Sequence, residues 1–369
     1  MYDVAIVGAG PAGATLARLI GAEYRVLLVD RRRLDVDPSD DMLRKPCGGL
    51  LAPAAQRELA RQGLGVPRSV ATGPQLFGVR TVDLAADLER LYQRFYLNVD
   101  REAFDRWLVS LVPDNVERCF GWNLTGLEAD PDAPTLHFRT AENGRATVRA
   151  RYVVGADGAN SAVRRYAYGK EPSPRSYVGV QALLGSAGQE PHYGAYFDSR
   201  ITDFYGWTVP KGDHLLVGLA LPAGGGAGAA FDRFVAELRT QGLVAGSELS
   251  RQAAPISRPT QPWHLLTGYG RVLLAGEAAG FISPSSAEGI SYALTSGRDL
   301  ARALSFGLEG VADRYLAASW PLAARVTLKV VKRQAIYAAP IRRAVMRSGL
   351  GAIEESAERT SPRTVWAHR

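Results

Sequence analysis

The first thirty residues constrain the fold most, because a glycine-rich turn joins two apolar segments through a helix-forming run. Residues 2–7 are nearly all apolar, which is typical of a strand buried on both faces. The turn at residues 8–13 follows at once, and residues 14–20 are helix-forming. A second apolar strand, residues 24–29, ends in Asp30. This order predicts a β-α-β unit at the start of a parallel sheet.

The turn has the glycine spacing of a dinucleotide-binding unit. Gly8 permits the sharp turn, Gly10 lets a pyrophosphate approach the backbone, and Gly13 lets the helix pack against the strand. The helix N-terminus offers amides and partial positive charge to the phosphates. Asp30 lies roughly 20 residues beyond Gly8, where an acid holds a ribose hydroxyl in such units. The alternative is a glycine-rich turn in another α/β protein, but the surrounding strands and helix favour a dinucleotide.

Two later segments repeat the passage from an apolar strand into a glycine-rich turn. Residues 152–165 run through Asp157-Gly158 toward Ser161 and Arg164, where a hairpin is the simpler interpretation of the Asp-Gly pair alone. Residues 271–290 pass through Gly276 and a Ser-Pro-Ser-Ser segment into a predicted helix.

Three such sites in this order resemble the flavoprotein superfamily that includes p-hydroxybenzoate hydroxylase and the geranylgeranyl reductases. The helix-forming stretch 100–108, with Arg101 at the position that contacts flavin, adds to the resemblance, which covers residues 1 to about 300. It implies bound FAD, with NAD(P)H as a transient electron donor. The cofactor-binding residues implied in this way are Gly8, Gly10, Pro11, Ala12, Gly13, Asp30, Arg31, Cys47, Gly48, Arg101, Asp157, Gly158, Gly276, Glu277, Gly289 and Ile290.

One position departs from the superfamily pattern, because Gly276 is followed by Glu277 where Asp is usual. The glutamate keeps the carboxylate and adds a methylene, so its hydrogen bond to the ribityl chain needs a displaced geometry.

Two segments resemble the geranylgeranyl reductase branch. Residues 45–49, Lys-Pro-Cys-Gly-Gly, contain Cys47, and residues 204–213 contain Tyr205 and Trp207 in a box that is similar to that of flavin halogenases as well. We expect Cys47 to donate a proton or position the substrate, with a buried structural cysteine as the alternative. Tyr205 and Trp207 are expected to line the substrate cavity, and core aromatic residues are the alternative.

The fold class expected is α/β, or α+β overall. A Rossmann-type FAD-binding domain (1–75, 98–170 and 263–310) is interleaved with an antiparallel-sheet substrate domain (76–97 and 171–262) and followed by a helical C-terminal region (311–369). That last region is expected to break at Pro321 and Pro340.

Composition limits the partners and the compartment. The formal charge of +7 comes with acids interspersed among the arginines, which does not support nucleic-acid binding. Two cysteines and five histidines without ligand spacing predict neither a disulfide framework nor a metal site. No apolar run reaches the length of a membrane span, and residues 1–20 lack the features of a signal peptide, so a cytoplasmic location is expected.

The tail between residues 325 and 347 carries seven cations and no acid among apolar residues. It predicts either a helix on an anionic membrane or a helix over the substrate cavity with a solvated basic face. The oligomeric state is left open.

The function predicted is that of an FAD-dependent oxidoreductase that reduces a C=C bond of an isoprenoid-like or other hydrophobic small molecule. The first alternative is an NAD(P)H-dependent monooxygenase that hydroxylates or epoxidises a small aromatic or natural-product substrate, because one fold serves both chemistries. The second alternative is a flavin-binding protein without turnover, which Glu277 favours.

Overall fold

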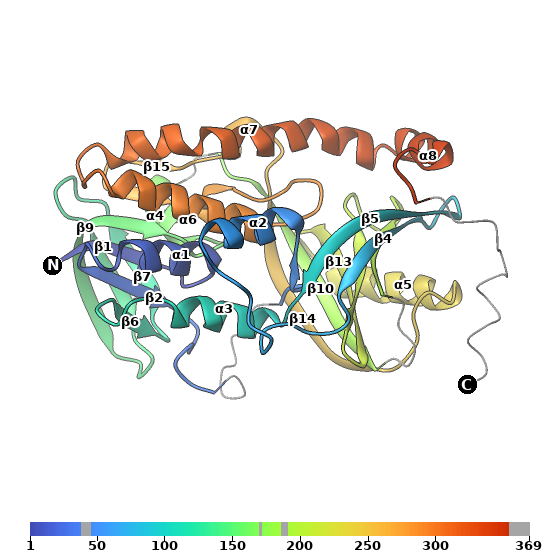
Figure 1. Cartoon of the computed structure of the whole chain (residues 1–369), viewed down its shortest axis with the longest axis horizontal. Helices are drawn as coiled ribbons and strands as arrows, with labels where there is room; N and C mark the ends of the chain where they lie inside the picture. Colours follow the sequence, from blue (N-terminus) through green and yellow to red (C-terminus); the bar gives the residue numbers. More distant parts are fainter. Residues whose placement is uncertain (38–45, 170–171, 186–190, 354–369) are drawn as a thin grey trace. The chain divides into compact units, whose positions relative to one another are not determined.

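The computed structural model describes residues 1–37, 46–169, 172–185 and 191–353 of the chain (Figure 1). These residues form two compact units. The first contains Met1–Ala71, Val99–Tyr177 and Pro255–Gln334, and the second contains Thr72–Asn98, Val178–Ala254 and the chain from Ala335 onward. Of the expected helical region 311–369, the described residues lie in the first unit up to Gln334 and in the second unit from Ala335 to residue 353.

A mainly parallel sheet in the order β15-β16-β9-β1-β2-β6 is the centre of the first unit. Its strands are β1 (Tyr2–Val7), β2 (Val26–Asp30), β6 (Glu117–Phe120), β9 (Arg145–Gly155), β15 (Gly268–Tyr269) and β16 (Val272–Leu274). The hairpin of β7 (Asn123–Glu128) and β8 (Thr135–Arg139) joins the sheet where β8 pairs with β9. All of β2 is buried, as expected for a strand covered on both faces. The predicted Rossmann-type α/β fold is confirmed.

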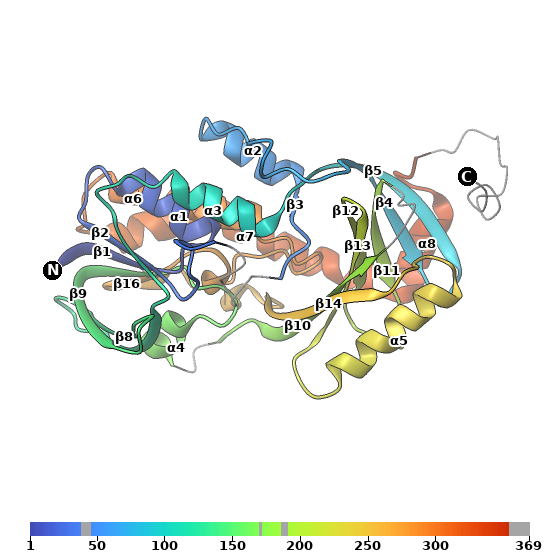
Figure 2. The same ribbon diagram turned by 90° about the horizontal axis from the view of Figure 1, so that it is seen from below.

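Helices cover both faces of this sheet. Figure 2 shows α1 (Pro11–Ile20), α3 (Arg101–Ser110) and α6 (Ile290–Leu304) on one side of the parallel strands, and α4 (Ala162–Tyr168) with β8 on the other. The remaining elements of this unit are β3 (Leu50–Leu51), α2 (Pro53–Arg61), the short 3-10 turns Pro262–His264 and Gly276–Ala279, and most of α7 (Val311–Tyr337). The helices α1 and α6 cross closely, because a Cβ added at Gly297 would lie 2.6 Å from the carbonyl oxygen of Ala12.

The second unit is a twisted sheet in the order β14-β10-β13-β12-β11-β4-β5. Its strands are β4 (Leu76–Asp83), β5 (Leu88–Asn98), β10 (Arg175–Gly185), β11 (His192–Phe197), β12 (Gly206–Lys211), β13 (His214–Pro222) and β14 (Glu248–Arg258). One face is covered by α5 (Ala227–Thr240), whose buried Phe231, Phe234 and Leu238 follow helical spacing. The helix approaches β12 closely, since a Cβ at Gly206 would lie 2.1 Å from the Phe234 ring.

Most pairs of neighbouring strands described in this sheet are antiparallel, as expected for the substrate domain, and one pair is parallel. The strands β4 and β11 pair in parallel, from Gly78 opposite His192 to Asp83 opposite Phe197. More than a hundred residues, including much of the first unit, separate these strands in the chain. A long connection permits either direction, whereas the short connections between neighbouring strands require antiparallel pairs.

The C-terminal residues form α7 (Val311–Tyr337) and α8 (Ala339–Ser348). The expected break at Pro321 was wrong, because Pro321 lies inside α7. A proline removes one backbone hydrogen bond from a helix. Residues on both sides of Pro321, including Tyr315, Leu322 and Val326, are buried, and their packing stabilises the helix through the proline. Among the described residues, no helix has the length and hydropathy needed to cross a membrane.

A buried cluster of charges fixes α8 within the second unit. Asp83 accepts hydrogen bonds from Arg342 (2.8 Å) and Arg343 (3.0 Å). Burial opposes ionisation of Asp83, but the two guanidinium groups outweigh it and lower the pKa of the carboxyl. The carboxylate is therefore a counterion for two arginines of the tail.

Replacing Asp83 by Asn removes this charge and leaves the buried Arg342 without a counterion. We expect Asp83→Asn to lower the free energy of unfolding by about 3 kcal/mol in urea denaturation. The matched change Asp213→Asn, at an exposed turn, is expected to alter it by less than about 0.5 kcal/mol. Equal losses in the two variants would contradict the assignment.

Candidate functional site

The three glycine-rich turns emerge together from one edge of the first sheet. Val7 of β1 pairs with Gly155 of β9, and Gly155 pairs with Leu274 of β16, so the three strands end in register. Backbone bonds continue past the ends, from the Ala156 N–H to Val7 (2.7 Å) and from the Ala275 N–H to Gly155 (2.9 Å). The carboxyl edge of a parallel sheet is where such folds bind ligands.

The first turn is shaped for an anion that approaches its backbone. Gly8 has a φ of +107°, and a Cβ at Gly13 would lie 1.8 Å from the Gly8 carbonyl oxygen, so both positions need glycine. At Gly10 a Cβ would meet no atom within 4 Å. Gly10 also begins α1 without a side-chain cap, followed by Pro11 and Ala12. The first amides of α1 therefore remain available to a phosphate.

The second turn is closed by its own side chains. Asp157 accepts hydrogen bonds from the Ser161 hydroxyl (2.5 Å) and from the Ala162 amide (2.7 Å), and Gly158 has a φ of +81°. Ser161 caps α4 by accepting from the Arg164 amide (3.0 Å). The turn is thus a strand-to-helix connection and not a hairpin.

Arg164 connects the second turn to the third. Its buried guanidinium donates to the carbonyl oxygens of Ala278 (3.1 Å) and His264 (3.1 Å). The third turn is also fixed from α6, because the Gly276 amide donates to the Ser296 hydroxyl (2.9 Å). A φ of +60° at Gly276 explains the glycine there.

Glu277 has a partner of its own in this structure. Its Oε1 accepts a hydrogen bond from the Ser257 amide (2.9 Å) at the end of β14. Gly289 and Ile290 lie where the third turn enters α6, so α6 begins at the turn as expected. The longer side chain of Glu277 is therefore accommodated within the protein.

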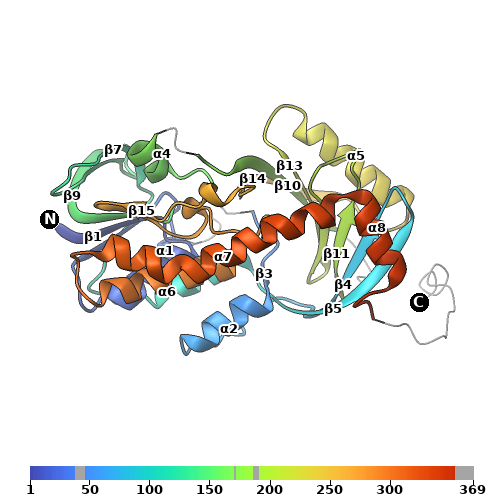
Figure 3. The ribbon, with the colours of Figure 1, turned by 90° about the horizontal axis from the view of Figure 1, so that it is seen from above.

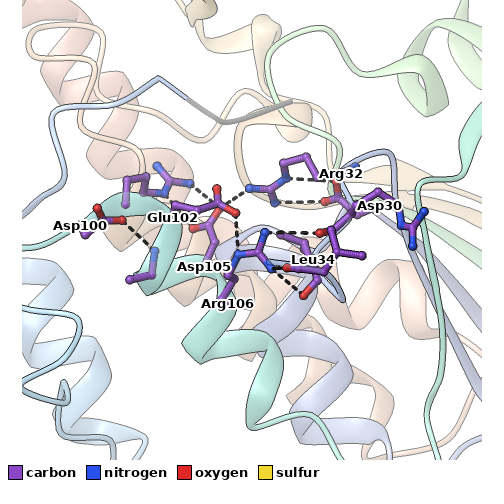
Figure 4. A network of polar contacts seen from close by, with 11 residues as sticks. Asp30, Arg32, Leu34, Asp100, Glu102, Asp105 and Arg106 are labelled. Carbon is purple, nitrogen blue, oxygen red and sulfur yellow. Dashed lines mark hydrogen bonds and ion pairs between the residues drawn. The ribbon is translucent and has the colours of Figure 1, made fainter. Parts of the chain in front are cut away.

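Asp30 belongs to a buried network that the sequence did not reveal (Figure 4). Its Oδ1 accepts from the Arg32 amide (2.9 Å) and Nε (3.1 Å), and its Oδ2 accepts from the Ala9 amide (2.8 Å) and Arg32 Nη2 (3.1 Å). A carboxylate has about four acceptor sites, so these bonds use them all. A ribose hydroxyl would therefore have to displace or share one of them, and the exposed Arg31 takes no part in this network.

The network continues from the end of β2 into α3. Arg32 Nη1 donates to Asp105 (2.8 Å), and Asp105 also accepts from Arg101 Nε (2.8 Å). Next to it, Arg106 pairs with Glu102 and donates to the carbonyl oxygens of residues 33, 34 and 36. These contacts join α3 to the loop after β2.

Burial opposes ionisation of Asp30, but Arg32 and the amide of Ala9 outweigh it and lower the pKa of the carboxyl. An unfolded aspartate titrates near a pH of about 3.9. The stability that this pair contributes is therefore complete above that pH and is lost as the pH falls through the lower folded-state pKa.

Cys47 lies at the far end of the same network. Its sulfur accepts from the Gly49 amide (3.5 Å) and from the side chain of Arg101. Burial opposes the charge of Arg101, but Asp105 and Cys47 outweigh it and raise its pKa. The Gly49 amide and the Arg101 guanidinium thus both donate to the sulfur. Gly48 lies beside it in the described chain, and Lys45 lies outside the described residues.

Tyr205 and Trp207 belong to the second unit, on the face of its sheet opposite α5. Tyr205 stacks on Phe197 (ring centroids 6.0 Å), contacts Trp207 (5.7 Å) and accepts a hydrogen bond from Tyr193 (3.0 Å). The indole of Trp207 lies over Gly218, where a Cβ would be 2.1 Å from the ring. Among the described residues, none accepts a hydrogen bond from the buried Trp207 Nε1.

The first unit fits the implied cofactor. An uncapped helix N-terminus, an open glycine at position 10 and three turns at one sheet edge are what the pyrophosphate and flavin of FAD require. Among the residues that the structure describes, no group of three His, Cys, Asp or Glu side chains gathers to hold a metal ion.

Comparison with known proteins agrees with this site. Residues 1–181 match the FAD binding domain family. The CbrA protein of Escherichia coli O157:H7 is 38% identical over 354 residues, which cover 96% of this chain and 98% of CbrA.

Two solved structures share the fold at low sequence identity. A geranylgeranyl bacteriochlorophyll reductase-like protein from Thermoplasma acidophilum matches with a TM-score of 0.77 and 20% identity, over 91% of this chain and 88% of that one. PqsL of Pseudomonas aeruginosa, a probable FAD-dependent monooxygenase, matches with a TM-score of 0.69 and 20% identity, over 95% and 99% of the two chains.

The two cysteines should react differently with iodoacetamide. Burial and then Glu117 raise the pKa of Cys119 to about 11, so little thiolate forms there near neutral pH. We expect Cys47 to be alkylated at least about tenfold faster than Cys119 at pH 8, as followed by peptide mass spectrometry.

An Arg101→Gln variant should slow the alkylation of Cys47 and leave that of Cys119 unchanged, and Arg101→Lys should restore part of the rate. A Cys47 rate that does not respond to Arg101 would contradict the contact between them.

Proposed function

This chain belongs to the family of the CbrA proteins and carries an FAD binding domain, and from that basis we propose that it reduces a carbon–carbon double bond in a hydrophobic small molecule. The FAD binding domain match and the fold support an FAD-dependent oxidoreductase. The substrate class and the reaction are the proposal, with NAD(P)H as electron donor and the cytoplasm as location.

The aromatic face of the second sheet carries the proposal of a hydrophobic substrate. Tyr193, Phe197, Tyr205 and Trp207 lie on one face of β11, β12 and the loop before β12, because alternate residues of a strand share a face. Aromatic walls with few polar groups suit apolar ligands. The buried Trp207 Nε1 is a single donor for one acceptor atom on such a ligand.

Cys47 is the group proposed to deliver the proton. FAD held at the three turns would supply hydride chemistry toward one carbon of the double bond, and the neighbouring carbon would need a proton from the protein. The overall change consumes one NAD(P)H and one proton and forms two C–H bonds. The Cys47 thiol would give its proton to that carbon, the guanidinium of Arg101 beside it would stabilise the resulting thiolate, and solvent could then reprotonate the sulfur.

A monooxygenase is the second candidate. The likeness to PqsL, a probable FAD-dependent monooxygenase, extends over 99% of that chain, and the three turns would serve this chemistry equally. A flavin-binding protein without turnover has less support, since Glu277 makes its own hydrogen bond to Ser257.

One experiment distinguishes double-bond reduction from monooxygenation. The purified protein should contain FAD, and its photoreduced flavin should be reoxidised without oxygen when a prenyl-chain alkene is added, as followed by flavin absorbance. Substrate-dependent oxygen consumption with a hydroxylated or epoxidised product would contradict the reductase and support the monooxygenase. Protein that contains no flavin would contradict the assignment as a whole.

The variant Cys47→Ala tests whether Cys47 delivers the proton. With FAD supplied at saturating concentration, we expect it to lose at least about tenfold in the rate of alkene-dependent reoxidation. The exchange Cys119→Ala, away from the network, should leave that rate unchanged. Full activity of Cys47→Ala would remove Cys47 from the reaction.

A further inference from the structure

The outer side of α7 carries apolar residues where a surface helix normally carries polar ones. Trp320 is 72% exposed, and Leu316, Leu328 and Val331 are each at least 60% exposed. At 3.6 residues per turn these four side chains lie within an arc of roughly 120°. We call this arc the α7 stripe. Figure 3 shows α7 facing the viewer, with no other element drawn in front of it.

The opposite side of α7 already supplies the packing that the fold needs. Tyr315, Leu322, Val326 and Val330 are buried there. A helix that is apolar on both sides is normally enclosed by other elements. The exposure of the α7 stripe therefore points to a partner outside the described chain.

Positive charge borders the α7 stripe along one side. Going around the helix axis, Arg325 and Lys332 lie next to one edge of the stripe, and Lys329 lies beyond them. The Nζ of Lys329 lies 5.2 Å from the centre of the Tyr292 ring. The chain contains no Asp or Glu between residue 314 and residue 353. Anionic surfaces are attracted to such a border, and cationic ones are repelled.

Within the second unit, α8 shows the same combination. Ile341 and Val345 are exposed at 50% and 43%, and the exposed Arg347 follows them. Its buried side holds Arg342 and Met346. Taken by itself, α8 therefore also carries outward apolar residues.

From these observations we propose that the α7 stripe docks on an anionic lipid bilayer, with the helix lying in the plane of the interface. Exposed Trp and Leu side chains enter the boundary of the acyl chains, while Arg and Lys reach the headgroups. A second copy of the chain fits less well, because two such surfaces would bring like charges together.

Docking would place the protein where a hydrophobic substrate dissolves, a consequence that rests on the proposed function. The docking itself rests only on α7. It can be measured without substrate or turnover, so its failure and the failure of the proposed function are distinguishable.

The test uses the purified holoprotein and vesicle flotation. We expect binding to vesicles of phosphatidylcholine with 30% phosphatidylglycerol to be at least tenfold tighter than binding to phosphatidylcholine alone, and to weaken as salt is raised. No preference for the anionic vesicles would overturn the proposal.

Two double variants with the same change of charge separate the stripe from general electrostatics. Trp320→Glu with Leu328→Glu should weaken binding at least tenfold, whereas Trp263→Glu with Leu249→Glu, at exposed residues elsewhere, should weaken it much less. Retention of bound flavin shows that each variant is folded. Equal binding by the two variants would overturn the proposal.

Analytical ultracentrifugation without vesicles tests whether a second copy of the chain binds the α7 stripe instead. A monomer in the wild type agrees with the proposal. A dimer that only the stripe variant dissociates, together with no vesicle binding, would overturn it in favour of self-association.

Discussion

The alignment of three strand ends is the constraint on which the candidate site depends. Val7, Gly155 and Leu274 are paired side by side, so three turns that lie far apart in the sequence leave the sheet at one edge. A shift of one residue in either pairing would turn the side chains of that strand to the opposite face. Backbone hydrogen bonds beyond the strand ends, and the bonds of Arg164 to the third turn, hold the alignment.

Local patterns were sufficient to predict the parts of the site made by backbone. Strand, turn and helix follow each other within a few residues around each glycine, so the sequence predicts them. The link from Asp30 through Arg32 to α3 was not predictable, because Arg32 and Asp105 meet only when β2 and α3 pack together. The strand β14 was missed as well, since its residues are mostly exposed and show no alternation of apolar and polar side chains.

The buried network belongs to the first unit and the aromatic face to the second. In the first unit, charges that run from Asp30 through Arg32, Asp105 and Arg101 reach the sulfur of Cys47. Removal of one member would leave a buried charge without a partner, which is costly. In the second unit the aromatic side chains share one sheet face and are apolar apart from a few hydroxyl and indole groups.

The central claim is that the first turn binds the pyrophosphate of FAD, and Gly10 offers the most direct test. A Cβ added there would meet no described protein atom within 4 Å, and the backbone has an ordinary φ of −71°. Gly10→Val should therefore leave the urea midpoint of the apoprotein unchanged while weakening FAD binding at least about a hundredfold, as followed by flavin fluorescence. Wild-type affinity for FAD in this variant would contradict the account.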